Sequence, residues 1–373
     1  MARLGEIFTI LSGGTPDKKE VSFYRHGTIP WVKTGDLKGK YVPEGIECIT
    51  EAGLNSSSAK LFPKDTVLVA MYGATIGACS ILPYDASTNQ ACAAFLPNDS
   101  VLPEYLFYFL SGKKEQFVKD GVGGAQPNIS AGYLKNVEFD VIPVAQQKEV
   151  ISSLNMSDNL IALRKQQLAK LDELVKARFV ELFGDPILNQ KGFPVYRMDE
   201  VVEFQGGSQP DKKYFEYEPT EDNIRLIQIR DYKTDKYITY IPKSMAKRFC
   251  TADDIMIGRY GPPIFQILQG IEGSFNVALM KATPKMGNKE FIRQFLKQDC
   301  LLEYLEGLSK RTAGQDGIQM DKLKAYPFPM PPIELQEEFE QFVKQTDKSK
   351  STVQQALDKL ETMKKALMQK YFG

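Results

Sequence analysis

An internal repeat constrains the fold of this 373-residue chain more than any other feature of its sequence. Toward the end of each copy, matching residues lie 189 positions apart, as Gln147 and Gln336 do, and this spacing persists to Gly184 and Gly373. The same spacing joins Gln126 with Gln315, Ile129 with Ile318, Leu134 with Leu323, Phe139 with Phe328, and Pro143 with Pro332. Solenoid repeats have periods of about 20 to 50 residues, so each copy is expected to be a whole domain with an appendage.

The larger part of each copy predicts a globular domain of mixed α/β class. Apolar, strand-like runs such as Val67 to Met71 and Val137 to Ile142 lie among glycines and prolines. Residues 103–119 have a helical pattern, and residues 289–308 repeat it. The sequence therefore predicts two related α/β domains.

The last 40 residues of each copy predict one long helix. Residues 144–183 and 333–372 contain neither Pro nor Gly and are rich in Glu, Lys, Gln, Leu and Ala. A helix of this length extends about 60 Å, more than one small domain covers, so we expect the two helices to pack on each other. The alternative is that each packs only on its own domain. The apolar positions expected to pack, or to dock a partner, are Leu160, Leu168, Leu171, Leu174 and Phe179 in the first helix and Val353, Leu357, Leu360, Met363 and Leu367 in the second.

These patterns divide the chain into four parts. They are a domain at residues 1–143, a helical region at 144–186, a second domain at 187–332 and a second helical region at 333–373. Polar residues at 155–158 and 346–347 are expected to bend or break the helices, with Asp158 and Asp347 as N-caps of the second segments.

The composition excludes several classes of protein. The 47 Lys and Arg residues balance the 47 Asp and Glu residues, so net charge does not argue for nucleic-acid binding, although a local basic face remains compatible with it. The five cysteines form no CxxC pair and predict neither a disulfide framework nor a zinc site, but reduced thiols in a cytosolic protein. No stretch predicts a signal peptide or a membrane span.

Catalytic patterns are missing from the sequence. The one histidine, His26, has no acid or nucleophile placed around it by a motif and is expected on a surface loop. We find no phosphate loop, nucleophile elbow, HExxH or EF-hand spacing, and no motif of a methyltransferase active site. The two copies share glycines, aromatics and apolar positions more than acids and bases, which favours a binding protein over an enzyme.

Three pairs of loops are candidates for binding. A Gly-Gly loop ending in Pro-Asp-Lys-Lys suits phosphates, a Tyr-Gly turn presents a ring, and the stretch 121–130, matched by 309–317, carries polar side chains for base edges. For each loop a purely structural turn is the alternative. The candidate contact residues are Gly13, Gly14, Lys18, Lys19, Lys33, Thr34, Tyr72, Gln126 and Asn128 in the first copy and Lys212, Lys213, Arg230, Arg259, Tyr260, Lys310, Arg311 and Gln315 in the second.

Several segments taken together are similar to a known family. They are Leu4 to Ile7 leading to Ser12-Gly13-Gly14-Thr15-Pro16, Ile29 to Leu37, Ala70 to Gly77, Asn128-Ile129-Ser130, Pro143 to Lys148, and Ile161 to Pro186. With these segments the chain resembles the specificity subunits of type I restriction-modification systems. The second copy is more divergent, since Arg230-Asp231-Tyr232 replaces Gly35-Asp36-Leu37.

The resemblance implies two target recognition domains, each reading one half of a bipartite site in double-stranded DNA, held apart by an antiparallel coiled coil. It also implies two DNA adenine methyltransferase subunits docked on the helices, with restriction subunits as optional further partners. This chain itself would carry no catalysis, cofactor or metal. Half-sites on one face of the DNA would lie about 34 Å apart.

Two other functions stay open at the level of sequence. One is a coiled-coil adaptor that joins proteins without reading DNA. The other is an enzyme, such as a nuclease, whose scattered acidic residues match no motif.

Overall fold

The computed structural model describes residues 2–121, 128–260, 264–309 and 317–373. The chain divides into two compact units. Unit 1 combines Met1–Lys165 with Gln355–Gly373, and unit 2 is Gln166–Gln354. Each unit therefore contains one globular part and segments of both long helices.

The globular part of unit 1, residues 2–143, is built on three small sheets. The first has the order β2 (Ile10–Ser12), β9 (Cys92–Phe95), β6 (Val67–Ala70) and β7 (Cys79–Ile81). The second has the order β4 (Cys48–Ile49), β3 (Ile29–Val32), β8 (Ala86–Thr88) and β5 (Leu61–Phe62), and β1 (Ala2–Arg3) pairs with β10 (Glu138–Phe139). Only the β3–β8 pair among these is parallel.

Unit 2 repeats this topology strand for strand. Its first sheet has the order β12 (Val202–Gly206), β19 (Leu279–Pro284), β16 (Ile255–Gly258) and β17 (Gln266–Gln269). Its second has the order β14 (Tyr240–Pro242), β13 (Asn223–Ile227), β18 (Gly273–Phe275) and β15 (Phe249–Cys250), and β11 (Val195–Arg197) pairs with β20 (Pro327–Pro329). The β13–β18 pair is again parallel. The predicted internal repeat of a mixed α/β domain is thus confirmed.

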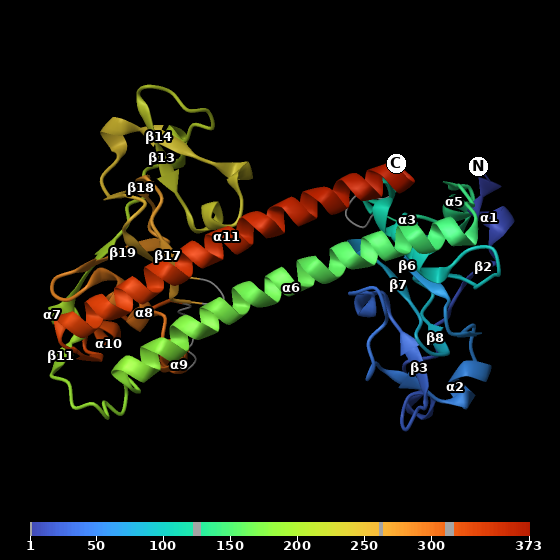
Figure 1. Cartoon of the computed structure of the whole chain (residues 1–373), viewed down its shortest axis with the longest axis horizontal. Helices are drawn as coiled ribbons and strands as arrows, with labels where there is room; N and C mark the ends of the chain where they lie inside the picture. Colours follow the sequence, from blue (N-terminus) through green and yellow to red (C-terminus); the bar gives the residue numbers. More distant parts are fainter. Residues whose placement is uncertain (1, 122–127, 261–263, 310–316) are drawn as a thin grey trace. The chain divides into compact units, whose positions relative to one another are not determined.

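Short helices complete each globular part. Unit 1 contains α1 (Leu4–Ile7), α2 (Glu51–Asn55), α3 (Pro103–Gly112), α4 (Lys114–Asp120) and α5 (Ala131–Lys135). Unit 2 contains α7 (Met198–Val201), α8 (Lys289–Leu296), α9 (Asp299–Ser309) and α10 (Met320–Lys324). In each unit the first sheet lies nearer the long helices and the second lies farther away (Figure 1).

Apolar runs explain the central strands. Every residue of β6 is buried, because this strand contacts neighbours on both of its faces. Helix α3 begins with Pro103 at its first position, where the missing N–H costs nothing. Its rings then pack with Phe139 and the first sheet in one core. The corresponding core of unit 2 gathers Phe291, Phe295 and Phe328.

The two long helices are α6 (Val144–Phe183) and α11 (Ile333–Phe372). Each is unbroken, so the expectation of a break with Asp158 or Asp347 as an N-cap is wrong. The small hydroxyl side chains there are accommodated within the helices, where they donate to backbone oxygens one turn back, Ser157 to Ser153 at 3.0 Å and Thr346 to Phe342 at 2.9 Å. Helix α6 ends at Gly184, whose φ of +76° only glycine adopts without strain.

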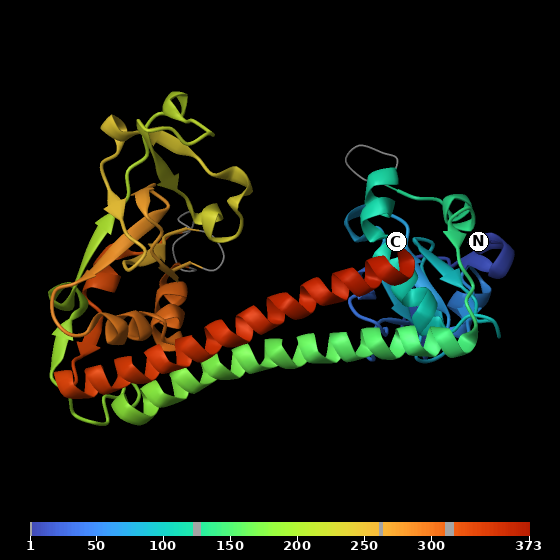
Figure 2. The ribbon, with the colours of Figure 1, turned by 45° about the horizontal axis from the view of Figure 1, so that its top comes forward.

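The helices run antiparallel within each unit, as Figure 2 shows. In unit 1, Lys165 pairs with Glu361 at 2.9 Å, and Asp158, earlier on α6, pairs with Lys364, later on α11. In unit 2, Lys350 pairs with Asp172 at 2.6 Å and Arg178 with Glu338 at 2.6 Å. Residue numbers rise along α6 as they fall along α11, which confirms the predicted antiparallel pairing.

The apolar positions predicted to pack between α6 and α11 differ in their burial. Phe179, Val353 and Leu357 are buried, and Leu168, Leu171, Leu360 and Leu367 are half-buried. Leu160, Leu174 and Met363 stay exposed. The buried positions match helix packing, and the exposed positions leave apolar surface on the outside of the pair.

Each long helix ends against the globular part of the unit that it reaches. In unit 1, the Phe372 ring lies 5.2 Å from the Tyr105 ring on α3. In unit 2, the Phe183 ring lies 4.7 Å from the Phe291 ring on α8. Phe183 and Phe372 are equivalent in the repeat, so both units close in the same way. Within the described part of the chain, no helix has the length and apolar character needed to span a membrane.

Candidate nucleic-acid interface

In unit 1 the predicted contact loops meet where several strands end. We call residues 13–19, 33–37, 71–76, 89–91 and 128–130 loop edge 1. The Gly14 N–H donates to the Thr88 carbonyl at 2.9 Å, and the Asn89 N–H donates to the Val32 carbonyl at 3.0 Å. The Ile129 N–H donates to the Met71 carbonyl at 3.0 Å. Hydrogen bonds between backbones therefore bring segments from five parts of the sequence together.

Unit 2 builds the same edge from its own loops. We call residues 207–213, 228–232, 259–260, 276–278 and 317 loop edge 2. The Asn276 N–H donates to the Ile227 carbonyl at 3.0 Å, and the Gly207 N–H donates to the Leu279 carbonyl at 3.1 Å. The Arg259 N–H donates to the Ala278 carbonyl at 2.9 Å. Both units thus gather the loops that the sequence pairs across the repeat.

The Gly-Gly motifs have a packing role in this arrangement. A Cβ atom on Gly13 would lie 2.1 Å from the Thr88 carbonyl oxygen, and one on Gly207 would lie 2.0 Å from the Asn276 carbonyl oxygen. The indole N–H of Trp31 donates to the Gly14 carbonyl at 3.0 Å. Gly13 and Gly14 are buried, so their effect on a ligand would pass through the shape of loop edge 1.

The lysines of loop edge 1 differ in their partners. Lys18 and Lys19 are exposed. The Lys33 ammonium lies 2.7 Å from the Glu47 carboxylate, which raises the pKa of Lys33 through the hydrogen bond they share. Thr34 begins a short 3-10 turn next to it. Lys18 and Lys19 are accordingly the lysines of this edge that are best placed to meet phosphates.

A tyrosine is exposed at the same place on both edges. Tyr72 forms a β-bridge with Asn128, and its side chain is exposed. Tyr260 forms the corresponding bridge with Gly317 and is exposed as well. The Arg259 guanidinium lies over the Tyr260 ring at 5.3 Å, which presents a planar cation beside an aromatic face.

The remaining basic residues of loop edge 2 are partly held by neighbours. The Arg230 guanidinium donates to the Thr239 hydroxyl at 3.1 Å and lies 5.9 Å from the Tyr237 ring. Lys213 lies over the Tyr214 ring at 5.0 Å, and Lys212 is exposed. Four candidate residues, Gln126, Lys310, Arg311 and Gln315, lie outside the described residues. The contact role of all these side chains stays a prediction.

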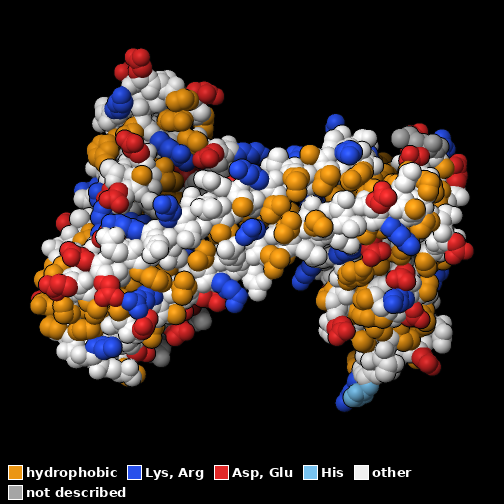
Figure 3. Space-filling model, in the orientation of Figure 1, with side chains coloured by type: hydrophobic (Ala, Val, Ile, Leu, Met, Phe, Trp, Pro, Cys, Tyr) orange, Lys and Arg blue, Asp and Glu red, His pale blue; other side chains and the backbone are white. Residues whose placement is uncertain are grey.

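The ionisable residues His26, Cys79 and Cys92 lie outside the two loop edges. His26 lies in a turn with φ of +59°, and Figure 3 shows the histidine at a tip of the surface of unit 1. Burial raises the pKa of the Cys79 and Cys92 thiols to about 12. Among the described residues, no three His, Cys, Asp or Glu side chains are grouped as metal ligands would be.

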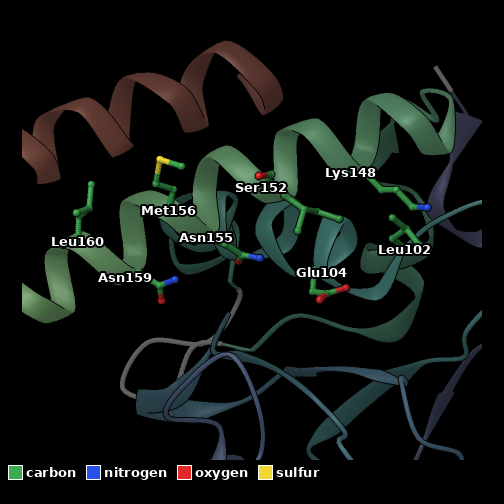
Figure 4. A pocket seen from close by; sticks show the side chains of 9 residues that line it. Leu102, Glu104, Lys148, Ser152, Asn155, Met156, Asn159 and Leu160 are labelled. Atoms are coloured by element: carbon green, nitrogen blue, oxygen red, sulfur yellow. The ribbon is translucent and has the colours of Figure 1, made fainter.

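A second surface lies on α6 in unit 1. A shallow hollow of about 700 Å³ is lined by Leu102 and Glu104 and by one face of the helix. Figure 4 shows Met156 and Leu160 on one side of α6, and Asn155 and Asn159 on another. Met156 is 63% exposed and Leu163, two turns further along, is 59% exposed. An apolar stripe thus remains open on the helix.

Two positioning features were missed by the sequence analysis. Gln147 and Gln336, each at the start of a long helix, are buried and hold backbone groups of the globular parts. The constant spacing of 189 residues contained this signal. The second feature is a polar cluster in which Asp158 contacts Tyr108, 50 residues earlier, and Lys364, 206 residues later. No sequence pattern indicates contacts between positions so far apart.

Both copies of the repeat are similar to known proteins. A family model described as "Type I restriction modification DNA specificity domain" matches residues 1–173 and again residues 190–362. The chain is 29% identical over 273 residues to the type I restriction enzyme MjaIX specificity subunit of Methanocaldococcus jannaschii, with 63% of each chain covered. It is 25% identical over 162 residues to the EcoR124I/EcoR124II specificity subunit of Escherichia coli.

The matches with these relatives are partial in length. The chain spans 63% of the first relative and 40% of the second. The crystal structure of a type I restriction-modification system S subunit from M. genitalium has a similar fold, with a TM-score of 0.54 at 15% identity. That likeness covers 100% of this chain and 95% of the other.

Proposed function

The chain belongs to the family of type I restriction-modification DNA specificity domains, and we propose that it reads a bipartite target in double-stranded DNA, one half with each unit. The observation that carries the proposal is the pair of loop edges. They have the same backbone construction, in which strand ends hold a Gly-Gly loop, a Tyr turn and a third loop together. One scaffold used twice suits a site with two separate halves.

The two edges carry different side chains, which supports recognition of a different base sequence by each edge. Arg259 on loop edge 2 takes the place of the buried Met71 on loop edge 1. Arg230 takes the place of Gly35. Arginine donates two hydrogen bonds to guanine in the major groove, and each good contact of this kind discriminates by about 1 to 3 kcal/mol. Loop edge 2 is therefore the better suited to a half-site that contains guanine.

Membership in this family, and relatives that are named specificity subunits, support the proposal that the chain acts as a specificity subunit without catalysis of its own. We propose that two DNA adenine methyltransferase subunits dock on its helices and that a restriction subunit can join the same assembly. The apolar stripe of Met156, Leu160 and Leu163 supports a docking role. A net charge of zero suits a division of work in which the partners supply many of the phosphate contacts.

The test is to express the chain with a type I adenine methyltransferase from the same genome and to map methylated adenines. The expected result is one bipartite motif with a fixed gap. Replacing residues 1–143 by the same region of another family member should change one half of the motif and leave the other unchanged. An adaptor that joins proteins without reading DNA would leave the motif the same after the exchange, which would contradict the proposal.

A further inference from the structure

A polar cluster lies where the globular part of unit 1 meets both long helices. It lines a groove of about 1170 Å³ bordered by the loop of Lys40, by α3 and by α6 and α11. The Tyr108 hydroxyl, on α3, is 2.8 Å from Asp158 Oδ2 and 2.7 Å from Asn155 Oδ1, and it shares its one proton between these two oxygens. Figure 4 shows Asn155 on α6.

Two lysines from other segments of unit 1 also belong to the cluster. The Lys40 ammonium donates to Asn155 Oδ1 at 2.6 Å and lies 5.0 Å from the Tyr108 ring. The Lys364 ammonium, on α11, pairs with Asp158 Oδ1. Asp158 therefore uses one carboxylate oxygen for the globular part and the other for the second helix. Burial lowers the pKa of Lys40, and burial raises the pKa of Tyr108 with the hydrogen bond to Asp158 adding to it.

The cluster constrains motions that apolar packing permits. The ring contacts of Phe372 with Tyr105 and Phe109, at 5.2 and 6.0 Å, hold the helix end on α3. Apolar contact is non-directional, so by itself it allows one body to turn or slide on another. Hydrogen bonds depend on distance and angle, and a network of them in a partly buried site fixes one arrangement.

Among the described residues of unit 2, the equivalent positions do not form the same hydrogen bonds, although the unit has the same fold. The repeat places Val175 where Lys364 is and Asp347 where Asp158 is. Val175 is buried in the apolar core of unit 2, and the Phe179 ring stacks on Phe291 at 5.7 Å. The Asp347 carboxylate lies 3.6 Å from Lys350 on its own helix. The same fold therefore forms in unit 2 with different side-chain contacts at this place, in which Lys350 pairs with Asp347 and with Asp172 on α6.

We propose that Lys40, Tyr108, Asn155, Asp158 and Lys364 form a clamp that fixes the angle of the globular part of unit 1 on the helix pair and so sets the gap that the complex accepts between half-sites. This inference rests on the proposed function. One added base pair moves a half-site by about 3.4 Å and turns it by about 35°, because the duplex completes a turn in about 10 base pairs over 34 Å. A clamp that restricts rotation of loop edge 1 makes the complex sensitive to such a step.

The experiment uses the complex of the full chain with the methyltransferase. Its DNA substrates carry both half-sites with the natural gap or with one base pair more or less, and methylation rates are compared. Asp158→Asn and Tyr108→Phe are expected to reduce the preference for the natural gap about tenfold, as the loss of one hydrogen bond to a charged group allows. Their half-site sequences should stay the same, and each variant should remain folded at the assay temperature, with a thermal unfolding midpoint only a few degrees lower.

Asp347→Asn is the matched control, since it changes the equivalent residue of the other unit and should keep the preference of the wild type. Tyr108→Phe leaves the pair of Asp158 and Lys364 intact, so it decides the question if Asp158→Asn does not fold. Rates that fall equally at every gap, or a preference that both variants retain, would overturn the clamp. A wild-type complex that methylates isolated half-sites would instead overturn the proposed function, and this is seen before any variant is compared.

Discussion

Gln147 and Gln336, 189 residues apart, make equivalent hydrogen bonds at the start of the two long helices. The Gln147 side-chain oxygen accepts from the Leu102 N–H at 2.8 Å, and the Gln336 oxygen accepts from the Asn288 N–H at 2.8 Å. The Gln147 amide also donates to the Ser100 and Ile142 carbonyls, and the Gln336 amide donates to the Pro331 carbonyl. Each long helix is thus hydrogen-bonded to its own globular part at the residue just before α3 or α8.

Gln147→Leu should destabilise the chain by about 1.5 to 3 kcal/mol, because three part-buried backbone groups lose a hydrogen-bond partner at about 0.5 to 1 kcal/mol each. Gln336→Leu should cost less, since it frees fewer backbone groups. Urea unfolding of the full chain measures both changes. Gln166→Leu, an exposed site on α6, is the control and should change the free energy of unfolding little. Equal stability of Gln147→Leu and the control would contradict the role of this side chain.

Tyr72→Ala and Tyr260→Ala should each weaken the binding of one half-site only. Both rings are exposed on their loop edges, and stacking of a base on an aromatic ring contributes about 1 to 3 kcal/mol. Binding of the assembled complex to DNA with one half-site altered at a time would show which half each tyrosine serves. Tyr217→Ala, at a ring that is 70% exposed and lies off loop edge 2, should leave affinity unchanged. A uniform loss at both half-sites from either variant would argue against separate edges.

Lys18→Ala and Lys19→Ala should weaken binding to all sequences alike. Each lysine that neutralises a phosphate adds about 0.9 to the slope of log affinity against log salt concentration, so each substitution should reduce the slope by that amount. Titrations of the complex with DNA at several salt concentrations provide the measurement. Lys191→Ala, in the segment that follows α6, serves as the control. Unchanged slopes would remove these lysines from the phosphate contacts.

Stability should fall in alkaline solution because two thiols are buried. The pKa of Cys79 and of Cys92 is raised to about 12, from a value near 9 in an exposed thiol. Between pH 9 and about 12 the unfolded chain therefore loses protons that the folded chain keeps, and the stabilising contribution that is complete below pH 9 is lost as the pH rises. Each thiol adds about 1.4 kcal/mol per pH unit to this loss.

The double variant Cys79→Ala/Cys92→Ala is the comparison for the alkaline loss of stability. Its urea midpoint should fall less steeply between pH 9 and pH 10.5 than that of the wild type. Parallel curves for the two proteins would show that these thiols do not titrate as their burial indicates.

Leu163→Asp should reduce association with the methyltransferase without unfolding the chain. The side chain is 59% exposed on α6, so a charge there costs little in the free chain but is costly in an apolar contact. Loss of such a contact residue typically costs about 1 to 2 kcal/mol, or about tenfold in affinity. Asn159→Asp adds the same charge beside the stripe and is the control. Equal affinity of wild type and Leu163→Asp would place the docking surface elsewhere.

The repeat made the duplicated fold and the helix pair predictable, because constant spacing needs no knowledge of contacts. It also paired Tyr72 with Tyr260, and the structure places them on equivalent edges. The helix break at Asp158 was predicted wrongly, since a residue that often caps a helix was instead used for contacts with Tyr108 and Lys364. Such contacts depend on how distant segments meet, and local patterns do not encode them.

Unit 1 is made of two separate segments of the chain, and this determines the order in which the two units can fold during synthesis. Unit 2 is one continuous stretch, Gln166–Gln354, whereas unit 1 needs Gln355–Gly373 to join Met1–Lys165. On the ribosome, residues 2–143 emerge before unit 2, yet the partners of Tyr105 and Asp158 on α11 emerge after it. The globular part of unit 1 is therefore translated before unit 2 but completed after it, and its apolar surface around Tyr105 stays uncovered in the interval, when chaperones and aggregation compete for it.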